Sequence, residues 1–334
     1  MSEYSIYTPV RSNLLRHVGS TFPKKERNRS DFSRRIISGF IEQNPEMINT
    51  IEGRIIAEEL IWQDAGCPMF FSDTPELMDM LWRSNMDVRI EDLDLGNMPR
   101  AFSFAWPKHK IDGVQPIGCL IWWGIGQDWK DASIRMDREY FVHSNLTLRG
   151  STPPDMRLGL HMSFAKEDVA AQRFGVNNSY YRASVPHDLL VSGLASGKDF
   201  EDTFKKYNSS ALIGAMSLSS EETHIQYVTF KLVLRMLVYM RACPELIREG
   251  YPGGKNHKAF ESRWDEFSPR VIRMPAKMTA DTHISPIAHL RTWYFRSYPV
   301  RRNGTRKNGV VFVSSTVVNA DVDPKTVVEG GQLG

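Results

Sequence analysis

The first third of the chain places its apolar residues at helical spacing. Residues 30–44 predict a helix that Ser30 caps, and residues 48–66 predict a second helix that ends at Gly66. Thr74 is followed directly by a proline, which predicts the start of a short third helix. We therefore expect the N-terminal third to fold as a group of helices.

The middle third changes to a period of two residues, which is typical of strands. Phe102, Phe104 and Trp106 alternate with small residues, and residues 117–125 form an apolar run that glycines interrupt. Residues 156–164 alternate most regularly of all. Because these runs follow one another without an intervening helix, we expect a sheet that is mostly antiparallel.

A long helix is predicted from Glu221 to Ala242, where Ser219 and Glu222 have the spacing of a capping box. The segment is apolar nearly all round, so we expect it to be buried against the sheet. Residues 250–288 are rich in proline, glycine and charge, and we expect them to form a long connection.

The C-terminal region contains two strand-like runs, residues 290–298 and 310–318, on either side of a loop with two Asn-Gly turn signals. The sequence therefore predicts an α+β fold with N-terminal helices, a central, mostly antiparallel sheet packed on a long buried helix, and a basic C-terminal β-hairpin. The expected parts are a basic arm (residues 1–29), an α+β core (30–249), the connection (250–288), and the aromatic, basic hairpin with its tail (289–334).

Charge distinguishes the C-terminal region from the rest of the chain. The 334 residues carry a formal net charge of +3, which is too small to indicate a general polyanion-binding protein. Residues 282–320 nevertheless contain six Arg and Lys residues and no Asp or Glu, whereas the remainder holds 36 basic and 39 acidic residues. The excess of positive charge therefore belongs to one end.

Cysteine usage and hydropathy bear on location. Cys67, Cys119 and Cys243 lie far apart in sequence and form no CxxC pair, which argues against a disulfide framework and a thiolate zinc site. The N-terminus lacks the apolar run of a signal peptide, and the most apolar stretch, Phe230–Met240, is too short to cross a bilayer. We expect free thiols, a cytoplasmic location and no membrane partner.

The hairpin interleaves cations with aromatic residues. Arginine offers bidentate donors to phosphate and aromatic rings offer stacking surfaces, which is the chemistry of single-stranded nucleic-acid binding. The alternative is a strand that buries its aromatic rings and leaves its arginines as a solvated edge. The candidate residues for binding nucleic acid or an acidic partner are His289, Arg291, Trp293, Arg296, Tyr298, Arg301, Arg302, Arg306 and Lys307.

Other motifs give weaker signals. Residues 193–199 imitate a phosphate-binding loop but are one residue short and lack its Ser or Thr. Glu91, Asp92 and Asp94 could bind a divalent metal, although we expect a solvated turn there because no further ligand lies at a supporting spacing. The nine histidines show no paired spacing, and no serine lies in a nucleophile elbow. We therefore expect no metal, no cofactor and no catalytic site.

Three patches in a shared order carry a family resemblance. The first patch is residues 237–247, an aliphatic and tyrosine-containing helix end that runs into Pro-Glu-Leu-Ile. The second is residues 289–298, which read His-x-Arg-x-Trp-x-x-Arg-x-Tyr and are followed by a closing strand that ends at Val318-Asn319. The third is residues 99–107, a strand between two prolines. This order resembles the type V-A anti-CRISPR family that blocks biogenesis of the type V effector nuclease, and its phage and prophage relatives.

The resemblance implies a mobile-element protein that acts in the host cytosol without an active site of its own. In the family, the N-terminal peptide of the effector nuclease is recognised during translation, and its messenger RNA is then lost. We accordingly expect a protein that binds a host CRISPR effector or other defence protein, or its nascent peptide, and contacts RNA or the ribosome through the hairpin. The alternatives are a metal-dependent RNA-processing enzyme and a phage structural or assembly protein.

Overall fold

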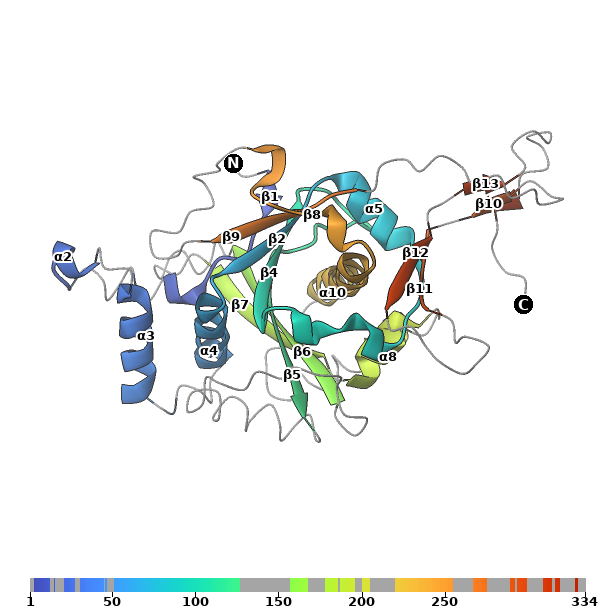
Figure 1. The fold of residues 1–334 in the computed structure, drawn as a ribbon. Coiled ribbons are helices and arrows are strands. Elements are labelled where there is room, and N and C mark those ends of the chain that lie inside the picture. The colour runs from blue at the N-terminus through green and yellow to red at the C-terminus, as the bar shows by residue number, and fades with distance from the viewer. Residues whose placement is uncertain are drawn as a thin grey trace.

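An eight-stranded mixed sheet forms the centre of the protein (Figure 1). The computed structural model describes residues 3–12, 15, 21–27, 31–44, 46, 51–126, 157–167, 178–185, 187–195, 200–204, 220–254, 267–274, 289–291, 293–298, 309–313, 316–318 and 328–329. Helices and mixed sheets together make the fold α+β, as the sequence predicts.

The central sheet has the order β7-β6-β5-β4-β2-β9-β8, and β1 pairs with β4. Its strands are β1 (Tyr4–Ser5), β2 (Pro68–Ser72), β4 (Ala101–Pro107), β5 (Cys119–Gly126), β6 (Arg157–Glu167), β7 (Asn178–Val185), β8 (Ile247–Glu249) and β9 (Ser268–Ile272). Only the pairings of β2 with β4 and with β9 are parallel; the other pairings within this sheet are antiparallel. The expectation of a mostly antiparallel sheet is confirmed.

The long helix α10 (Ser220–Ala242) covers one face of the sheet. Alternation along β4 turns Phe102, Phe104 and Trp106 toward it, and all three are fully buried. Leu234 and Val238 are also buried, so the predicted buried helix is confirmed.

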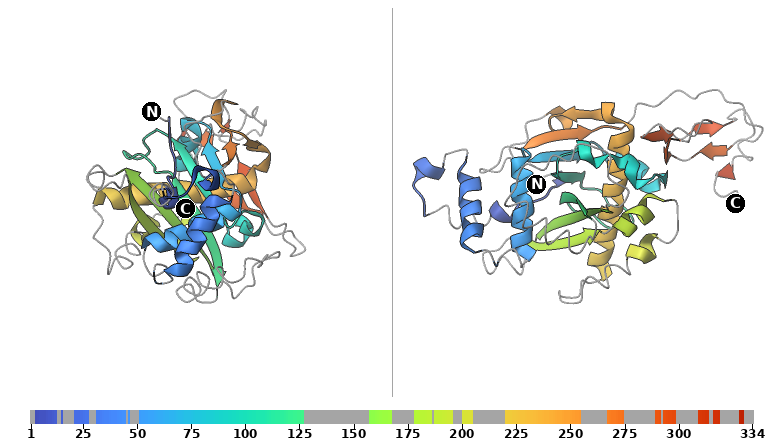
Figure 2. Two further views of the ribbon diagram at one scale, coloured as in Figure 1. Left: turned by 90° about the vertical axis from the view of Figure 1, so that its left-hand side faces the viewer. Right: turned by 60° about the horizontal axis from the view of Figure 1, so that its bottom comes forward.

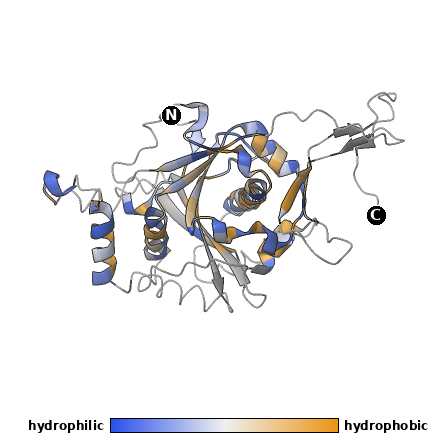
Figure 3. Cartoon of the chain, in the orientation of Figure 1, coloured by the Kyte–Doolittle hydropathy of each residue, from blue (hydrophilic) through white to orange (hydrophobic). Residues whose placement is uncertain are grey.

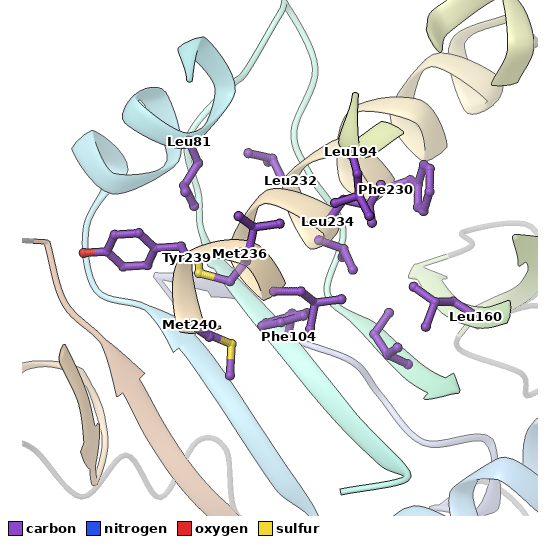
Figure 4. Close-up of a cluster of buried hydrophobic side chains, with 14 of the residues drawn as sticks. Leu81, Phe104, Leu160, Leu194, Phe230, Leu232, Leu234, Met236, Tyr239 and Met240 are labelled. Atoms are coloured by element: carbon purple, nitrogen blue, oxygen red, sulfur yellow. The ribbon is translucent and has the colours of Figure 1, made fainter. Parts of the chain in front are cut away.

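Figure 4 shows Leu232, Leu234 and Met236 in this cluster with Leu81, Phe104 and Leu160. The helices α5 (Pro75–Arg83) and α8 (His187–Leu194) complete the layer, and Figure 3 shows hydrophobic colour on these elements around α10.

The helix α4 (Ile51–Asp64) covers the opposite face, with α3 (Phe32–Gln43) packed outside it. The other parity of the strands, including Ala101, Ala105 and Trp122, faces this second core. Segments from the expected basic arm also enter it: β1 pairs with β4, and Tyr7 and Leu15 are buried. The helix α2 (Lys24–Arg27), also in that arm, has no buried residue.

The N-terminal helices follow their sequence signals closely. Thr74 caps α5, because its Oγ1 accepts a hydrogen bond of 3.3 Å from the backbone N–H of Leu77. Gly66 ends α4 with a φ of 81°, a conformation that glycine adopts at little cost. Asp31 takes the N-cap position of α3, while the expected caps Ser30 and Ser219 lie outside the described residues.

Residues 250–288, expected as a connection, contribute the strand β9 to the interior of the sheet. β9 lies between β2 and β8, and its Val271 and Ile272 are buried. The short Ser-Pro-Arg-Val-Ile segment carries almost no local strand signal, so its place depends on pairing with β2, which lies about 200 residues earlier.

Two small sheets contain the C-terminal region. One has the order β12-β11-β3, from β3 (Asn85–Asp87), β11 (Tyr294–Ser297) and β12 (Val310–Val313). The other has the order β13-β10-β14, from β10 (His289–Arg291), β13 (Thr316–Val318) and β14 (Val328–Glu329). The antiparallel pairs β11–β12 and β10–β13 share one register, since Tyr294 is opposite Val313 and His289 is opposite Val318. The two pairs are therefore halves of the predicted hairpin.

Cys67, Cys119 and Cys243 are buried, and none of the three forms a disulfide bond. Within the part of the chain that the structure describes, no helix has the combined length and hydropathy that crossing a membrane requires.

Candidate functional site

We call the paired strands β10, β11, β12 and β13 the C-terminal ribbon. Its inner half, β11 with β12, is anchored in the core on α10. Phe295 is fully buried, and its ring lies 4.9 Å from that of Phe312 and 6.1 Å from that of Tyr239 on α10. The Tyr239 hydroxyl donates a 2.7 Å hydrogen bond to the carbonyl of Arg273, and burial raises the pKa of this phenol well above its usual value. For Phe295, burial in the core is therefore the correct reading.

β3 holds the inner half from its other side. The backbone N–H of Asn85 donates to the carbonyl of Trp293 at 3.0 Å, and the N–H of Arg89 donates to Ser297 Oγ at 2.9 Å. Trp293 is half-buried and packs against the α10 core. Trp293, Phe295 and Ser297 thus face the body together, as the alternation predicts.

The opposite face of the inner half carries Arg296, which is exposed. Asp87 on β3 is aligned with Arg296 in the parallel pairing, and the Tyr294 hydroxyl donates to its carboxylate at 3.4 Å. Burial and the charge of Asp87 raise the pKa of Tyr294. The sequence suggests a ribbon without a nearby carboxylate, and this is wrong. The fold brings Asp87 to the inner half from 207 positions away, and it aligns Glu329 of β14 with Leu290 of the outer half.

The outer half of the ribbon lies away from the body. Figures 1 and 2 show β10 and β13 beyond β11 and β12, at the end of the molecule opposite α2 and α3. β10 carries the backbone of His289 and Arg291, opposite Val318 and Thr316. The open end of the hairpin is thus the end that projects.

The loop of the hairpin begins and ends at the inner half. The backbone N–H of Tyr298 donates to the carbonyl of Gly309 at 3.1 Å and closes the strand pair there. Gly309 has a φ of 142°, and a Cβ at this position would lie 3.0 Å from the half-buried Tyr298 ring. The remaining candidates, Arg301, Arg302, Arg306 and Lys307, lie between these two residues and outside the described part of the chain.

The acidic cluster near residue 92 is tied to arginines. Asp92 is buried and its carboxylate accepts from Arg89 Nη2 at 2.5 Å, whereas Asp94 pairs with Arg241 at 3.3 Å. The expected solvated turn is therefore wrong for Asp92, which lies beneath α10. Among the residues that the structure describes, no group of three His, Cys, Asp or Glu side chains is arranged to hold a metal ion.

Sequence reasoning missed two buried carboxylates on α4. Glu59 accepts hydrogen bonds from the Tyr7 hydroxyl at 2.5 Å, the Val10 N–H at 2.6 Å and the Arg11 N–H at 2.9 Å. Arg11 is itself fully buried, and its Nη1 donates to the Glu59 carbonyl at 2.6 Å. Burial raises the pKa of Glu59 to about 7, opposed by Arg11 and the three donors. Glu59 thus fixes the N-terminal segment to α4.

Glu58 makes the equivalent connection to the sheet. It accepts from Ser163 Oγ on β6 at 2.8 Å and forms an ion pair with Arg182 on β7, whose Nε and Nη2 lie 2.8 and 2.7 Å away. The sequence does hold a signal for both carboxylates. They lie between the apolar residues 55–57 and 60–62, so the helix leaves no polar stripe on which they could be exposed.

The chain was compared with known proteins by sequence. No protein-family model matches it, and no curated protein is significantly similar to it.

Proposed function

We propose that this chain is a binding protein of a mobile element that counters host defence. It recognises a host CRISPR effector or other defence protein, or the nascent peptide of one, in the host cytoplasm, and its C-terminal ribbon holds RNA at the site of synthesis. The effect on the host is loss of effector biogenesis, and the chain needs no catalytic centre for this. The order of motifs in the sequence supports the class of protein, and the ribbon supports the contact with RNA.

The proposed contact with RNA is supported by the division of the ribbon into an inner and an outer half. The inner half fixes the ribbon to α10 through Phe295, and the outer half holds β10 clear of the body. Residues 282–320 contain no acidic residue, so the charged residues of the ribbon strands and loop are all basic, while Glu329 of the neighbouring β14 is aligned with Leu290 of β10. A cationic strand pair on a fixed base suits the backbone of a single-stranded RNA, which binds largely through its phosphates. The inner half is fixed against the body on α10, whereas the outer half lies clear of it, so we assign the contact to the outer half and the loop.

Salt-dependent RNA binding tests this assignment. A variant with Arg291, Arg301 and Arg302 replaced by Ala should bind single-stranded RNA more weakly, to a similar degree for different sequences. The log–log dependence of affinity on salt should flatten by about 0.7 for each phosphate group that the variant no longer binds. The matched control replaces Lys24, Lys25 and Arg34, three exposed cations at the opposite end of the molecule. Equal weakening in the control, or no binding by the unmodified protein, would reject the ribbon as the RNA site.

Replacing Trp293 distinguishes a role in anchoring the ribbon to the core from a role in stacking on RNA bases. Because it packs on the α10 core, Trp293→Ala should lower the free energy of unfolding, by up to about 3–5 kcal/mol for a buried ring. The RNA affinity of the folded fraction should stay unchanged. A loss of about 1–3 kcal/mol in RNA binding at constant stability would instead make Trp293 a stacking residue.

The protein partner is tested by capture from host cells with and without RNase. A defence protein retained after RNase treatment supports direct recognition, whereas loss of all partners would leave only the RNA contact. Depletion of the effector in cells that express the chain, but not in cells that express a variant without residues 289–334, would link binding to biogenesis.

A further inference from the structure

Two cations interrupt the otherwise apolar stretch Phe230–Met240 of helix α10. Lys231 and Arg235 are one turn apart, with Tyr227 one turn before them, so the three side chains share the face of α10 that packs on α5. Both cations are only partly exposed. Two like charges at this spacing repel each other, so the fold retains an arrangement that is unfavourable for an isolated helix.

The ammonium group of Lys231 lies on aromatic rings. Its Nζ is 3.8 Å from the centre of the Trp82 ring and 5.6 Å from that of Tyr227. Within the described part of the chain, no carboxylate forms an ion pair with it. Asp112 and Glu201 act on it only through longer-range charge, and Asp112 pairs with His224 at 3.4 Å instead. Three ammonium donors are therefore available to a ligand.

Arg235 leaves a buried donor unused. Its Nη2 donates to the carbonyl of Ser84, at the end of α5, with a distance of 3.0 Å. Its Nε is buried and has no hydrogen-bond partner among the described residues. A buried guanidinium N–H without an acceptor is costly, so such a group is expected to have one.

Both cations have lost much of their hydration, and neither forms an ion pair with a residue that the structure describes. Burial, and next the charge of Arg235, lower the pKa of Lys231 to about 8, while burial lowers that of Arg235 to about 10. A bound anion would offset both the lost hydration and the repulsion between the two cations. Its oxygens would accept hydrogen bonds in place of water, and its negative charge would attract both cations.

We propose that Lys231 and Arg235 form a binding site for a small oxyanion of the phosphate class between α5 and α10. A doubly charged phosphate matches the two positive charges, and its oxygens accept from Nζ and from Nε at once. The rings of Trp82 and Tyr227 lie against Lys231 Nζ, and such apolar surroundings strengthen charge-assisted hydrogen bonds. The site is independent of the C-terminal ribbon and of the proposed contact with RNA.

Titration of the full-length protein with inorganic phosphate, with adenosine monophosphate and with acetate tests the site at constant ionic strength. The readouts are the Nε–H resonance of Arg235 and the melting temperature. Phosphate or the nucleotide should shift this resonance and raise the melting temperature, and acetate should do neither. A response to phosphate alone identifies the free ion, and a stronger response to the nucleotide identifies a phosphomonoester.

Variants separate the site from general surface charge. Lys231→Met and Arg235→Met should each weaken phosphate binding by about 10-fold or more, the loss expected for a hydrogen bond to a charged group. Arg83→Met removes an exposed cation next to the site and should leave binding unchanged. If the unmodified protein shows no phosphate-specific shift at Nε, only water reaches the site and the inference is wrong. Equal loss in Arg83→Met would also overturn it. The resonance of the unmodified protein decides the question even if a variant fails to fold.

Discussion

The two faces of the central sheet bury charge in different ways. On the α4 face, Glu58 and Glu59 are buried, but each is compensated by an arginine and by hydrogen-bond donors from distant segments. On the α10 face, Lys231 and Arg235 lie together with no ion pair among the described residues, against an otherwise apolar core. The cost of removing charge from water applies on both faces, and Asp92 beneath α10 is paired with Arg89, so among the described residues Lys231 and Arg235 stand out as partly buried cations without an ion pair.

This difference indicates what the charges do. Compensated charges on α4 connect segments that are far apart in the sequence, since Glu59 holds residues 7–11 and Glu58 holds β6 and β7. Their role is to fix the fold. In the described part of the chain, Lys231 and Arg235 contact α5 and its end without forming an ion pair, and we assign them to the proposed ligand.

The largest effect should come from breaking a buried pair on the α4 face. Arg182→Met leaves Glu58 buried without its countercharge and should lower the free energy of unfolding by about 3–5 kcal/mol. The double variant with Glu58→Met should recover most of that loss. The control is Arg34→Met, whose ion pair with Asp64 is largely exposed and is worth about 0–1 kcal/mol. Urea denaturation measures all three, and similar losses in Arg182→Met and Arg34→Met would contradict the comparison.

A smaller effect concerns Glu59 and pH. Its pKa of about 7 in the folded protein lies above its ordinary value of 4.5, so the folded state binds its proton more tightly. Its contribution to stability is therefore full below pH 4.5 and is lost as the pH rises through 7. Urea denaturation between pH 5 and 8 should show the unmodified protein losing stability relative to Glu59→Gln as the pH increases. A constant difference between the two proteins would mean that Glu59 stays ionised throughout.

The smallest effect is expected on the α10 face. Without phosphate, Lys231→Met removes the interaction with Trp82, worth about 1 kcal/mol, but also relieves the repulsion from Arg235. The net change in the free energy of unfolding should be below about 1 kcal/mol, far from that of Arg182→Met. A loss as large as that of Arg182→Met would show that Lys231 is essential to the fold and would remove the contrast between the two faces.

The sequence by itself determined the elements whose signals are local. The stop of α4, the cap of α5, the buried helix α10, the alternation of β4 and the hairpin of the ribbon all follow from spacing within about thirty residues. Alternation along the strand also accounts for the shared face of Trp293, Phe295 and Ser297, because successive side chains of a strand point to opposite sides.

Only the tertiary structure decided which segments meet. β9 is a strand because β2 and β8 lie on either side of it, and the N-terminal segment enters the core because Glu59 accepts its backbone N–H groups. Asp87 lies beside the ribbon for the same reason. Such contacts join residues tens to hundreds of positions apart, and a carboxylate on a helix carries no local mark of the partner that will neutralise it. Hydrogen bonding and charge compensation depend on distance in space, so they became visible only once the chain was folded.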